Sequence, residues 1–337
     1  MTTEHPADPQ RATAPTTPTA PSSPGPGAAP RRFGVLGTGH WARTCHGAAL
    51  AAHPDVELVG FWGRDGARAA AAAKEVGGRG FDDLDALLDR VDAVAVALPP
   101  DVQAPLAARA ARAGKHLLLD KPLALDVDAA DDVVAAARET GVASVVFVTY
   151  LFMPEITDWV ARMRGLAAEH GPWEGAVGRW AGTLDAPGNP FRDSAWRHER
   201  GGLWDTGPHA LSVLLSLLPP VERVAAARGV RDAVNVVLEH EGGPGTSLSL
   251  TLFAPEGAGG SFAVVWGPGG RHDMPRFAGT PQEGHARAVD ALRESARTGR
   301  PHPLGVGHAR DTVAVLAAAQ AHLARPASER TTPVPRS

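Results

Sequence analysis

The sequence predicts an α/β protein in two parts: a parallel sheet enclosed by helices, then a second α/β part with a mostly antiparallel sheet. Between residues 33 and 150, short continuous apolar runs alternate with helical stretches, which is typical of parallel strands buried on both faces. Between residues 174 and 267, several runs alternate apolar with polar residues between Gly- or Pro-containing turns, which favours antiparallel strands with one face on helices. The 337 residues suffice for roughly two domains.

The individual elements follow from these patterns in chain order. The expected strands of the first part are residues 33–36, 55–62, 92–100, 115–122 and 143–150. The expected helices between them are residues 43–53, 67–76, 82–90, 104–114 and 128–141. In the second part we expect strands at 174–184, 233–240, 246–254 and 260–267, and helices at 154–170, 211–218, 285–299 and 307–324.

Composition separates two tails from the two expected domains. Residues 1–30 are rich in Pro, Ala, Thr and Ser and nearly free of large apolar residues, so we expect a disordered tail. We expect a nucleotide-binding domain at 31–149, a substrate and oligomerisation domain at 150–325, and a loose tail at 326–337.

Several classes of function are disfavoured. A net charge of -4 argues against a nucleic-acid partner. No apolar run approaches the roughly 18 residues that cross a membrane, so no membrane partner is expected. The single cysteine, Cys45, allows no internal disulfide, which favours a cytoplasmic protein. No His/Cys cluster has metal-ligand spacing, so no metal is expected.

A glycine turn between the first strand and the first helix predicts dinucleotide binding. The stretch from Gly37 to Ala42 reads GTGHWA, a match to G-x-G-x-x-G/A in the required strand–turn–helix context. Gly37 permits the tight turn, Gly39 lets the backbone approach a pyrophosphate, and Ala42 allows close helix–strand packing. The expected cofactor contacts in this turn are Gly37, Thr38, Gly39, His40 and Trp41.

The end of the second strand favours NADP over NAD. An NAD site usually places an acidic residue there, about 20 residues after the glycines, whereas this chain has Gly63 and Arg64. A small residue and an arginine suit a 2′-phosphate. Asp65 is better explained as the N-cap of the next helix. The alternative for Arg64 is an ordinary solvated surface arginine.

Two further strand ends and one late motif complete the candidate site. Ligands of open parallel sheets sit at the carboxyl ends of strands, where Leu98-Pro99 and Asp120-Lys121 lie. The late stretch GGLWDTGPHAL, residues 201–211, places Asp205 and His209 one helical turn apart. Because Pro208 belongs in a first helical turn, we expect a helix that begins near residues 204–206, or a kink there.

Taken in order, GTGHWA, DAVAVALPP, AGKHLLLDKPLA and WRHERGGLWDTGPH resemble the Gfo/Idh/MocA oxidoreductases over residues 32 to 325. The resemblance implies an N-terminal Rossmann domain and a C-terminal α/β domain with an open, mostly antiparallel sheet. It also implies a homodimer or homotetramer formed through that open face. Carried across motif by motif, it implies a catalytic set of Lys121, Asp205 and His209.

These residue types suit the interconversion of an alcohol and a ketone. A nicotinamide moves the hydride, so the protein must handle the proton and the charge on the reacting oxygen. A lysine at a strand end can stabilise that oxygen, and a histidine can pass the proton, with a nearby carboxylate raising its basicity or orienting its ring. We therefore expect an NAD(P)-dependent dehydrogenase or reductase acting on a small-molecule sugar, cyclitol or related metabolite.

Each proposed site residue also has a purely structural explanation. Lys121 can be an ordinary strand-end lysine, Asp205 a helix cap, and His209 a core histidine. His198 is expected at the surface, and Tyr150 is expected to pack rather than to bind substrate. The pair Trp196-Arg197 can serve only to brace its loop.

Four positions depart from the family pattern. Gln103, Leu151 and Ser212 replace polar or charged family residues, which suggests fewer polar contacts to the substrate. Asp120 replaces the glutamate of the E-K-P motif, a conservative change. Gln103, Leu151 and Ser212 leave open a catalytically silent NAD(P)-binding sensor. An imine reductase on the same scaffold also stays open, because lysine, aspartate and histidine would serve C=N reduction as well.

Overall fold

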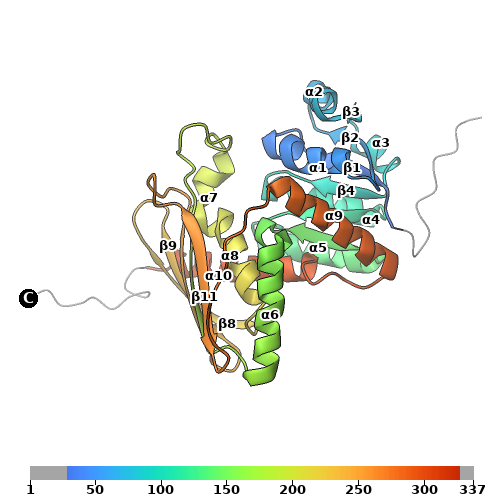
Figure 1. Ribbon diagram of the computed structural model, residues 1–337. Coiled ribbons are helices and arrows are strands. Elements are labelled where there is room, and N and C mark those ends of the chain that lie inside the picture. The colour runs from blue at the N-terminus through green and yellow to red at the C-terminus, as the bar shows by residue number, and fades with distance from the viewer. Residues whose placement is uncertain (1–28, 327–337) are drawn as a thin grey trace, which may run out of the picture.

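The computed structural model describes residues 29–326, which form two six-stranded sheets with helices around and between them (Figure 1). Almost all of the two expected tails, residues 1–30 and 326–337, lies outside the described residues. No helix in this part of the chain is long and apolar enough to cross a lipid bilayer.

The first sheet, sheet A, is entirely parallel, as the continuous apolar runs predicted. Its strands, in spatial order, are β3 (Arg79–Phe81), β2 (Glu57–Trp62), β1 (Arg32–Leu36), β4 (Ala93–Val96), β5 (His116–Asp120) and β6 (Ser144–Phe147). The order reverses at β1 and β4, so their carboxyl ends open a crevice of the kind that holds ligands in such sheets. The three-residue strand β3 was not predicted.

The helices of this half begin and end where local chemistry dictates. They are η1 (Ala42–Gly47), α1 (Ala48–Ala52), α2 (Gly66–Val76), α3 (Leu84–Leu88), α4 (Pro100–Arg112) and α5 (Val127–Thr140). The carboxylate of Asp65 accepts the backbone N–H groups of Ala67 and Arg68, which confirms its role as the N-cap of α2. The first predicted helix differs from expectation, because η1 is a wide π-helical turn that continues into α1.

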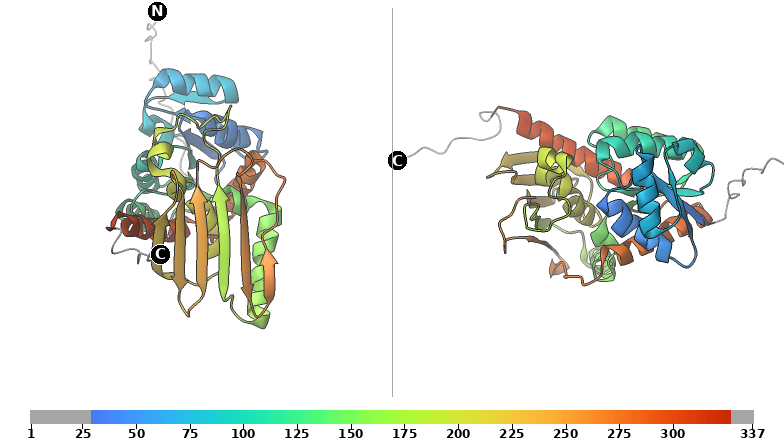
Figure 2. Two further views of the ribbon diagram at one scale, coloured as in Figure 1. Left: turned by 90° about the vertical axis from the view of Figure 1, so that its left-hand side faces the viewer. Right: turned by 90° about the horizontal axis from the view of Figure 1, so that it is seen from above.

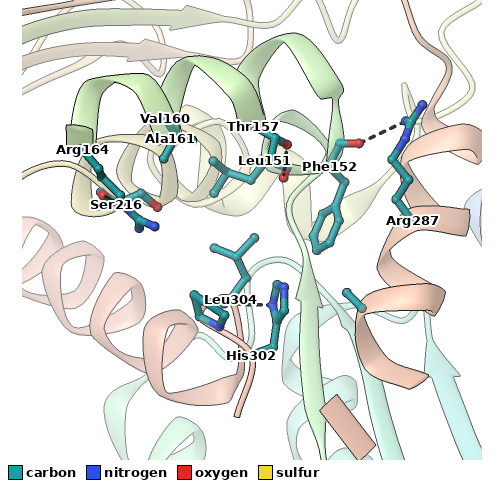
Figure 3. Close-up of a pocket in the computed structure, with 12 residues that line it drawn as sticks. Leu151, Phe152, Thr157, Val160, Ala161, Arg164, Ser216, Arg287, His302 and Leu304 are labelled. Atoms are coloured by element: carbon teal, nitrogen blue, oxygen red, sulfur yellow. Dashed lines mark hydrogen bonds between the residues drawn. The ribbon is translucent and has the colours of Figure 1, made fainter. Parts of the chain in front are cut away.

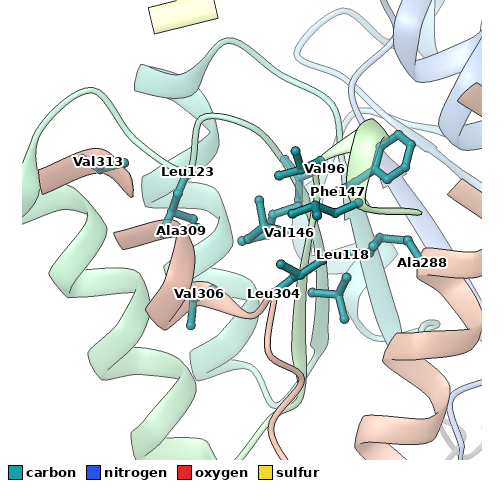
Figure 4. Close-up of a cluster of buried hydrophobic side chains, with 14 of the residues drawn as sticks. Val96, Leu118, Leu123, Val146, Phe147, Ala288, Leu304, Val306, Ala309 and Val313 are labelled. Atoms are coloured by element: carbon teal, nitrogen blue, oxygen red, sulfur yellow. The ribbon is translucent and has the colours of Figure 1, made fainter. Parts of the chain in front are cut away.

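The end of the chain returns to sheet A. Helix α9 (Pro281–Thr298) packs on β5, β6, η1 and α1, whereas α10 (Val306–Ala324) packs on α5 and β6. Figure 4 shows the apolar cluster that results, with Ala288 of α9 on one side of the sheet and Ala309 and Val313 of α10 on the other. The division of the chain at residue 150 stays a prediction, and residues from both sides of it form this core.

The second sheet, sheet B, is mixed and mostly antiparallel, as predicted. Its strands, in spatial order, are β12 (Gly270–Asp273), β11 (Gly260–Gly267), β7 (Gly175–Ala181), β10 (Gly245–Thr251), β9 (Val234–His240) and β8 (Val221–Arg228). Among the described strand pairs of sheet B, only β7 and β10 run parallel to each other. The two edge strands, β8 and β12, were not predicted.

One face of sheet B is covered and the other is open. The helices α6 (Pro154–His170), α7 (Ala195–Asp205), α8 (Gly207–Leu215) and α10 lie on the side facing sheet A (Figure 1). No helix crosses the outer face (Figure 2). The exposed large apolar residues of its strands are Val177, Val237, Phe262 and Trp266.

Candidate active site

The lysine of the site is held by the end of β5. The side chain of Gln103, buried in α4, donates to the carbonyl oxygens of Asp120 and Pro122 at 2.7 and 3.0 Å. Its amide oxygen accepts the backbone N–H of Asp120 at 3.1 Å. These bonds fix the backbone on both sides of Lys121, so the ammonium group projects from a rigid strand end.

The acid and the histidine come from the junction of α7 and α8. Asp205 is the last residue of α7, and His209 is the third residue of α8. Pro208 lies in the first turn of α8, where its missing N–H costs nothing, so the predicted break occurs at Thr206. Gly202 anchors the preceding turn, because a Cβ there would lie 2.5 Å from the Cα of Thr251 on β10.

The structure brings Lys121 and Asp205 into direct contact across 84 residues of sequence. The Lys121 Nζ donates to Oδ1 of Asp205 at 2.8 Å and to its carbonyl oxygen at 2.7 Å. Arg197 reaches the same Oδ1, with its Nε at 3.3 Å. The Arg197 guanidinium stacks between the rings of Phe191 and Trp196, at 4.4 and 4.6 Å from their centres. Arg197 therefore braces its loop, as one interpretation of the sequence held, and also serves the site.

These charges set the protonation of the acid and the histidine. Burial alone would raise the pKa of Asp205, but the charges of Lys121 and Arg197 outweigh it and lower the pKa to about 2. Burial, reinforced by the Lys121 charge, lowers the pKa of His209 to about 3. Asp205 acts to raise the pKa of His209, as expected of a nearby carboxylate, but burial is the larger effect and the net shift is downward. At neutral pH the site holds a neutral imidazole beside a carboxylate shared by two cations.

The site lines a cavity of about 540 Å³ between sheet A and the second half of the chain, called here the junction cavity. From the first half it is bordered by Gly39, His40, Trp41, Ala42, Ala97, Leu98, Pro99, Asp120, Lys121 and Thr149. The polar residues from the second half are Thr183, Asn189, Asp193, Ser194, Arg197, Asp205 and His209. Phe191 of the second half lies against the rings of His40 and Trp41, with centres 5.7 and 5.9 Å away. The second half thus contacts the glycine turn directly.

A neighbouring cavity of about 480 Å³, called here the turn cavity, lies on the other side of the glycine turn. It is bordered by Gly37, Thr38, Trp62, Gly63, Arg64, Asp65, Arg68, Leu98, Pro99 and Val102. Leu98 and Pro99 border both cavities. Every residue predicted to contact cofactor or substrate therefore borders one cavity or the other.

Comparison with known proteins identifies the family. Residues 31–150 match the family described as "Oxidoreductase family, NAD-binding Rossmann fold". The chain is 32% identical over 284 residues to dTDP-3,4-didehydro-2,6-dideoxy-alpha-D-glucose 3-reductase of Streptomyces antibioticus, covering 79% of this chain and 81% of the relative. The chain belongs to the Gfo/Idh/MocA oxidoreductase family.

Solved structures show the same fold. GenD2 from gentamicin A biosynthesis, in complex with NAD, has a TM-score of 0.75 at 22% identity over 90% of this chain and 97% of that one. KijD10, a 3-ketoreductase from Actinomadura kijaniata in complex with TDP-benzene and NADP, has a TM-score of 0.66 at 21% identity, covering 86% and 97%. These likenesses show the fold, a Rossmann half and a sheet-bearing second half. The family match identifies the protein as an oxidoreductase with an NAD(P)-binding Rossmann half.

The glycine turn of this oxidoreductase fits a dinucleotide. A Cβ built on Gly39 would meet no atom within 4 Å, so the backbone there is open to the approach of a pyrophosphate. Gly37 has a φ of 128°, and a Cβ on it would lie 2.5 Å from the carbonyl oxygen of Ala97. A Cβ on Gly63 would lie 2.7 Å from the Thr38 methyl group. Sequence reasoning missed Arg68, a second exposed arginine on the same cavity as Arg64, because Arg68 lies inside α2 and outside the strand-end position at which a cofactor contact is sought.

Three of the four family departures lie outside the lining of the junction cavity, whereas Asp120 borders it. Gln103 supports β5, and Leu151 and Ser212 are buried away from the cavity lining. None of these three residues borders the cavity, and their effect on the polar contacts to the substrate stays a prediction. His198 is exposed, as expected.

Tyr150 packs rather than lines the junction cavity, as expected. Its hydroxyl group lies 2.8 Å from Oγ of Ser261, and its ring lies 5.3 Å from the His209 ring. It therefore supports the histidine from behind.

A third cavity, of about 340 Å³, lies away from Lys121 between α6, α9 and the segment before α10 (Figure 3). Its walls are mostly apolar, including Leu151, Phe152 and Leu304. The two arginines that border it already bond to backbone carbonyls, Arg164 to Ser216 and Arg287 to Phe152. No acidic side chain lines it, so it holds no acid–base pair like Asp205 and His209 in the junction cavity.

Proposed function

We propose that this oxidoreductase interconverts a hydroxyl and a ketone group on a sugar-type metabolite, with Lys121, Asp205 and His209 forming the catalytic set. The observation that carries the proposal is the Lys121–Asp205 contact at 2.8 Å on the wall of the junction cavity, with His209 beside it. A bound nicotinamide supplies or accepts the hydride.

The Lys121 ammonium is the group placed to hold the reacting oxygen. Asp205 and Gln103 fix its position before substrate arrives, so little reorganisation accompanies the development of negative charge on that oxygen. In the direction of ketone reduction, Lys121 donates a hydrogen bond and then a proton to the oxygen. This leaves Lys121 as a neutral amine. His209, itself neutral, relays a proton from solvent back to that amine by accepting at one ring nitrogen and releasing from the other, and its Nδ1 has no protein partner among the described residues.

The substrate class follows from the cavity wall and from the relatives. The second half lines the junction cavity with hydroxyl, amide and charged side chains, which suit a substrate that carries several hydroxyl groups. The relative from Streptomyces antibioticus is named as a reductase of a dTDP-linked keto-sugar. A keto-sugar linked to a nucleotide is therefore the first substrate class to test.

NADP is the proposed cofactor. Arg64 and Arg68 both border the turn cavity, and no acidic side chain other than the capping Asp65 borders it. Two exposed guanidinium groups suit the two negative charges of a 2′-phosphate.

The proposed quaternary structure is a homodimer or homotetramer associated through the outer face of sheet B. Val177, Val237, Phe262 and Trp266 are exposed there on three different strands, β7, β9 and β11. A row of apolar side chains across an uncovered sheet is a surface that a second copy would bury.

One experiment tests the catalytic and cofactor assignments together. NADPH and NADH affinities are measured by fluorescence titration for wild type, Arg64→Ala, Arg68→Ala and the control Lys74→Ala, which removes a charge from the far end of α2. Turnover of nucleotide-linked keto-sugars is then measured for wild type and Lys121→Ala. We expect NADPH preference that either arginine variant weakens and Lys74→Ala leaves intact, and loss of turnover in Lys121→Ala with cofactor binding retained. Full turnover in Lys121→Ala would refute the catalytic set.

A further inference from the structure

A buried histidine stands directly behind the catalytic strand end. His46 on η1 is fully buried, and its Nε2 lies 3.2 Å from Oδ2 of Asp120. The other carboxylate oxygen of Asp120, Oδ1, accepts the backbone N–H of Lys121 at 2.7 Å. One carboxylate therefore joins the backbone of the catalytic lysine to the imidazole of His46.

The imidazole of His46 has no other hydrogen-bond partner among residues 29–326. Its Nδ1 is buried and unpaired, and so are both ring nitrogens of His285 on α9. The two rings lie against each other with centres 4.2 Å apart, and Phe147 meets both edge to face. Packing thus fixes the ring of His46, and its one polar contact is directed at Asp120.

The position of His46 depends on the unusual helix after the glycine turn. The π-helical turn spans Ala42–Gly47, immediately after the predicted phosphate contacts. The backbone N–H of Arg43 donates to the carbonyl oxygen of Gly39 at 3.2 Å, so the turn and the helix are one continuous piece of backbone. Such π turns inside helices are frequent at functional sites. His46 therefore connects the cofactor turn to the end of β5 through a single side-chain contact.

We propose that His46 is a positioning residue for hydride transfer, which holds the Asp120 carboxylate and through it fixes Lys121 relative to the glycine turn. This inference rests on the proposed role of Lys121. His46 is not one of the residues that line the junction cavity or the turn cavity, so it acts only through Asp120.

The charges around Asp120 give the expected pH behaviour. The groups around Asp120 are Cys45 and His46 of η1, Lys121 directly after β5, and His209 of α8, and His285 of α9 lies against the ring of His46. Burial alone would raise the pKa of Asp120, but the hydrogen bond and charge of His46, followed by Lys121, lower it. Loss of the His46 contact therefore raises the pKa of Asp120, and the acidic limb of the rate profile moves to higher pH.

The test compares two amides that differ in reach. In His46→Gln the amide nitrogen occupies the place of Nε2 and can still donate to Asp120, whereas in His46→Asn it falls short. We expect His46→Asn to lower kcat by about 10- to 100-fold, the size of one hydrogen bond to a charged group, and His46→Gln to recover most of the loss. The acidic limb of kcat against pH should shift upward in the Asn variant only.

The matched control is His53→Asn. His53 is also a buried histidine whose Nε2 meets an aspartate, Asp290, at 3.1 Å, but it lies at the end of α1 and borders neither cavity. His53→Asn should leave the pH profile unchanged. Equal kcat and pH profile in His46→Asn and wild type would overturn the proposal, and so would equal losses in the Asn and Gln variants.

Two further readouts separate this proposal from the proposed function. In the Asp120→Asn background, His46→Asn should cause no additional loss of kcat, because its effect passes through the carboxylate. If the fold losses of kcat from the two substitutions multiply in the double variant, the proposal is overturned. In the cofactor-free protein, the ¹⁵N spectrum of labelled histidine should show the His46 Nε2 resonance shifting in Asp120→Asn, and an unmoved resonance would contradict the contact. Turnover retained in Lys121→Ala would instead reject the proposed function.

Discussion

Replacing His209 with glutamine should make the free energy of unfolding depend less on pH below about pH 6.5. Folding lowers the pKa of His209 from 6.5 to about 3. Its folded pKa lies below its unfolded pKa, so below pH 6.5 the unfolded chain binds one more proton there than the folded protein does. The free energy of unfolding therefore falls as pH drops from about 6.5 towards 3, and this loss is absent above the unfolded pKa.

The size of the effect follows from the shift. One proton corresponds to about 1.4 kcal/mol per pH unit, so between pH 7 and pH 5 the wild type should lose about 2 kcal/mol of stability at His209 alone. Other buried histidines, among them His285 and His308, add their own losses in both proteins. The difference between wild type and His209→Gln isolates the single proton.

Urea denaturation at half-unit steps from pH 5 to 7.5 measures this difference. The control is Val213→Ala, a buried change on the same helix that removes no titratable group. It should lower the whole curve without altering its slope. The same slope in His209→Gln and wild type would show that the imidazole titrates normally and that burial and the Lys121 charge do not hold it neutral.

Three other outcomes are expected. Gly39→Ala should keep a free energy of unfolding within about 1 kcal/mol of wild type but bind NAD(P)H about 10-fold more weakly in fluorescence titration, and intact cofactor affinity would contradict the pyrophosphate assignment. Gly37→Ala should instead lose about 3 kcal/mol of unfolding free energy in denaturation, because the φ of 128° and the nearby carbonyl of Ala97 exclude a side chain. Arg197→Met should lower kcat/KM about 10-fold and raise the pH of the acidic limb, since Asp205 then loses one of its two cations; an unchanged profile would limit Arg197 to bracing its loop. Phe262→Glu should convert the oligomer to monomers in size-exclusion chromatography with light scattering, and an unchanged mass would move the interface elsewhere.

The sequence pattern predicted elements best where hydrophobic periodicity was strong. The five longer strands of sheet A, together with α6 and α9, were anticipated because buried apolar runs or clear helical spacing leave little choice. The edge strand β12, with the sequence GRHD, carries no apolar pattern at all, and β8 is interrupted by three consecutive alanines that serve a helix equally well. Both strands exist because a neighbouring strand offers hydrogen bonds, which a local pattern does not record.

The sequence predicted the candidate residues of the site but not the contacts between them. Motif order placed Lys121, Asp205 and His209 together, but nothing in the sequence indicated that Arg197 shares the carboxylate. His46 and Asp120 are 74 residues apart, and their contact depends on a π-helical turn without a clear sequence signal. The downward pKa shift of His209 has no sequence signal either, because it depends on how much water the finished fold excludes.

The return of the C-terminal helices to sheet A has a consequence for synthesis on the ribosome. When β6 has emerged, the apolar faces later covered by α9 and α10 are still without their partners. At about 5–20 residues per second, the segment up to α10 follows after roughly 10–30 s. During that interval the nascent first half presents a bare hydrophobic surface, a natural target for a ribosome-associated chaperone, and a gene truncated after residue 150 should yield insoluble protein.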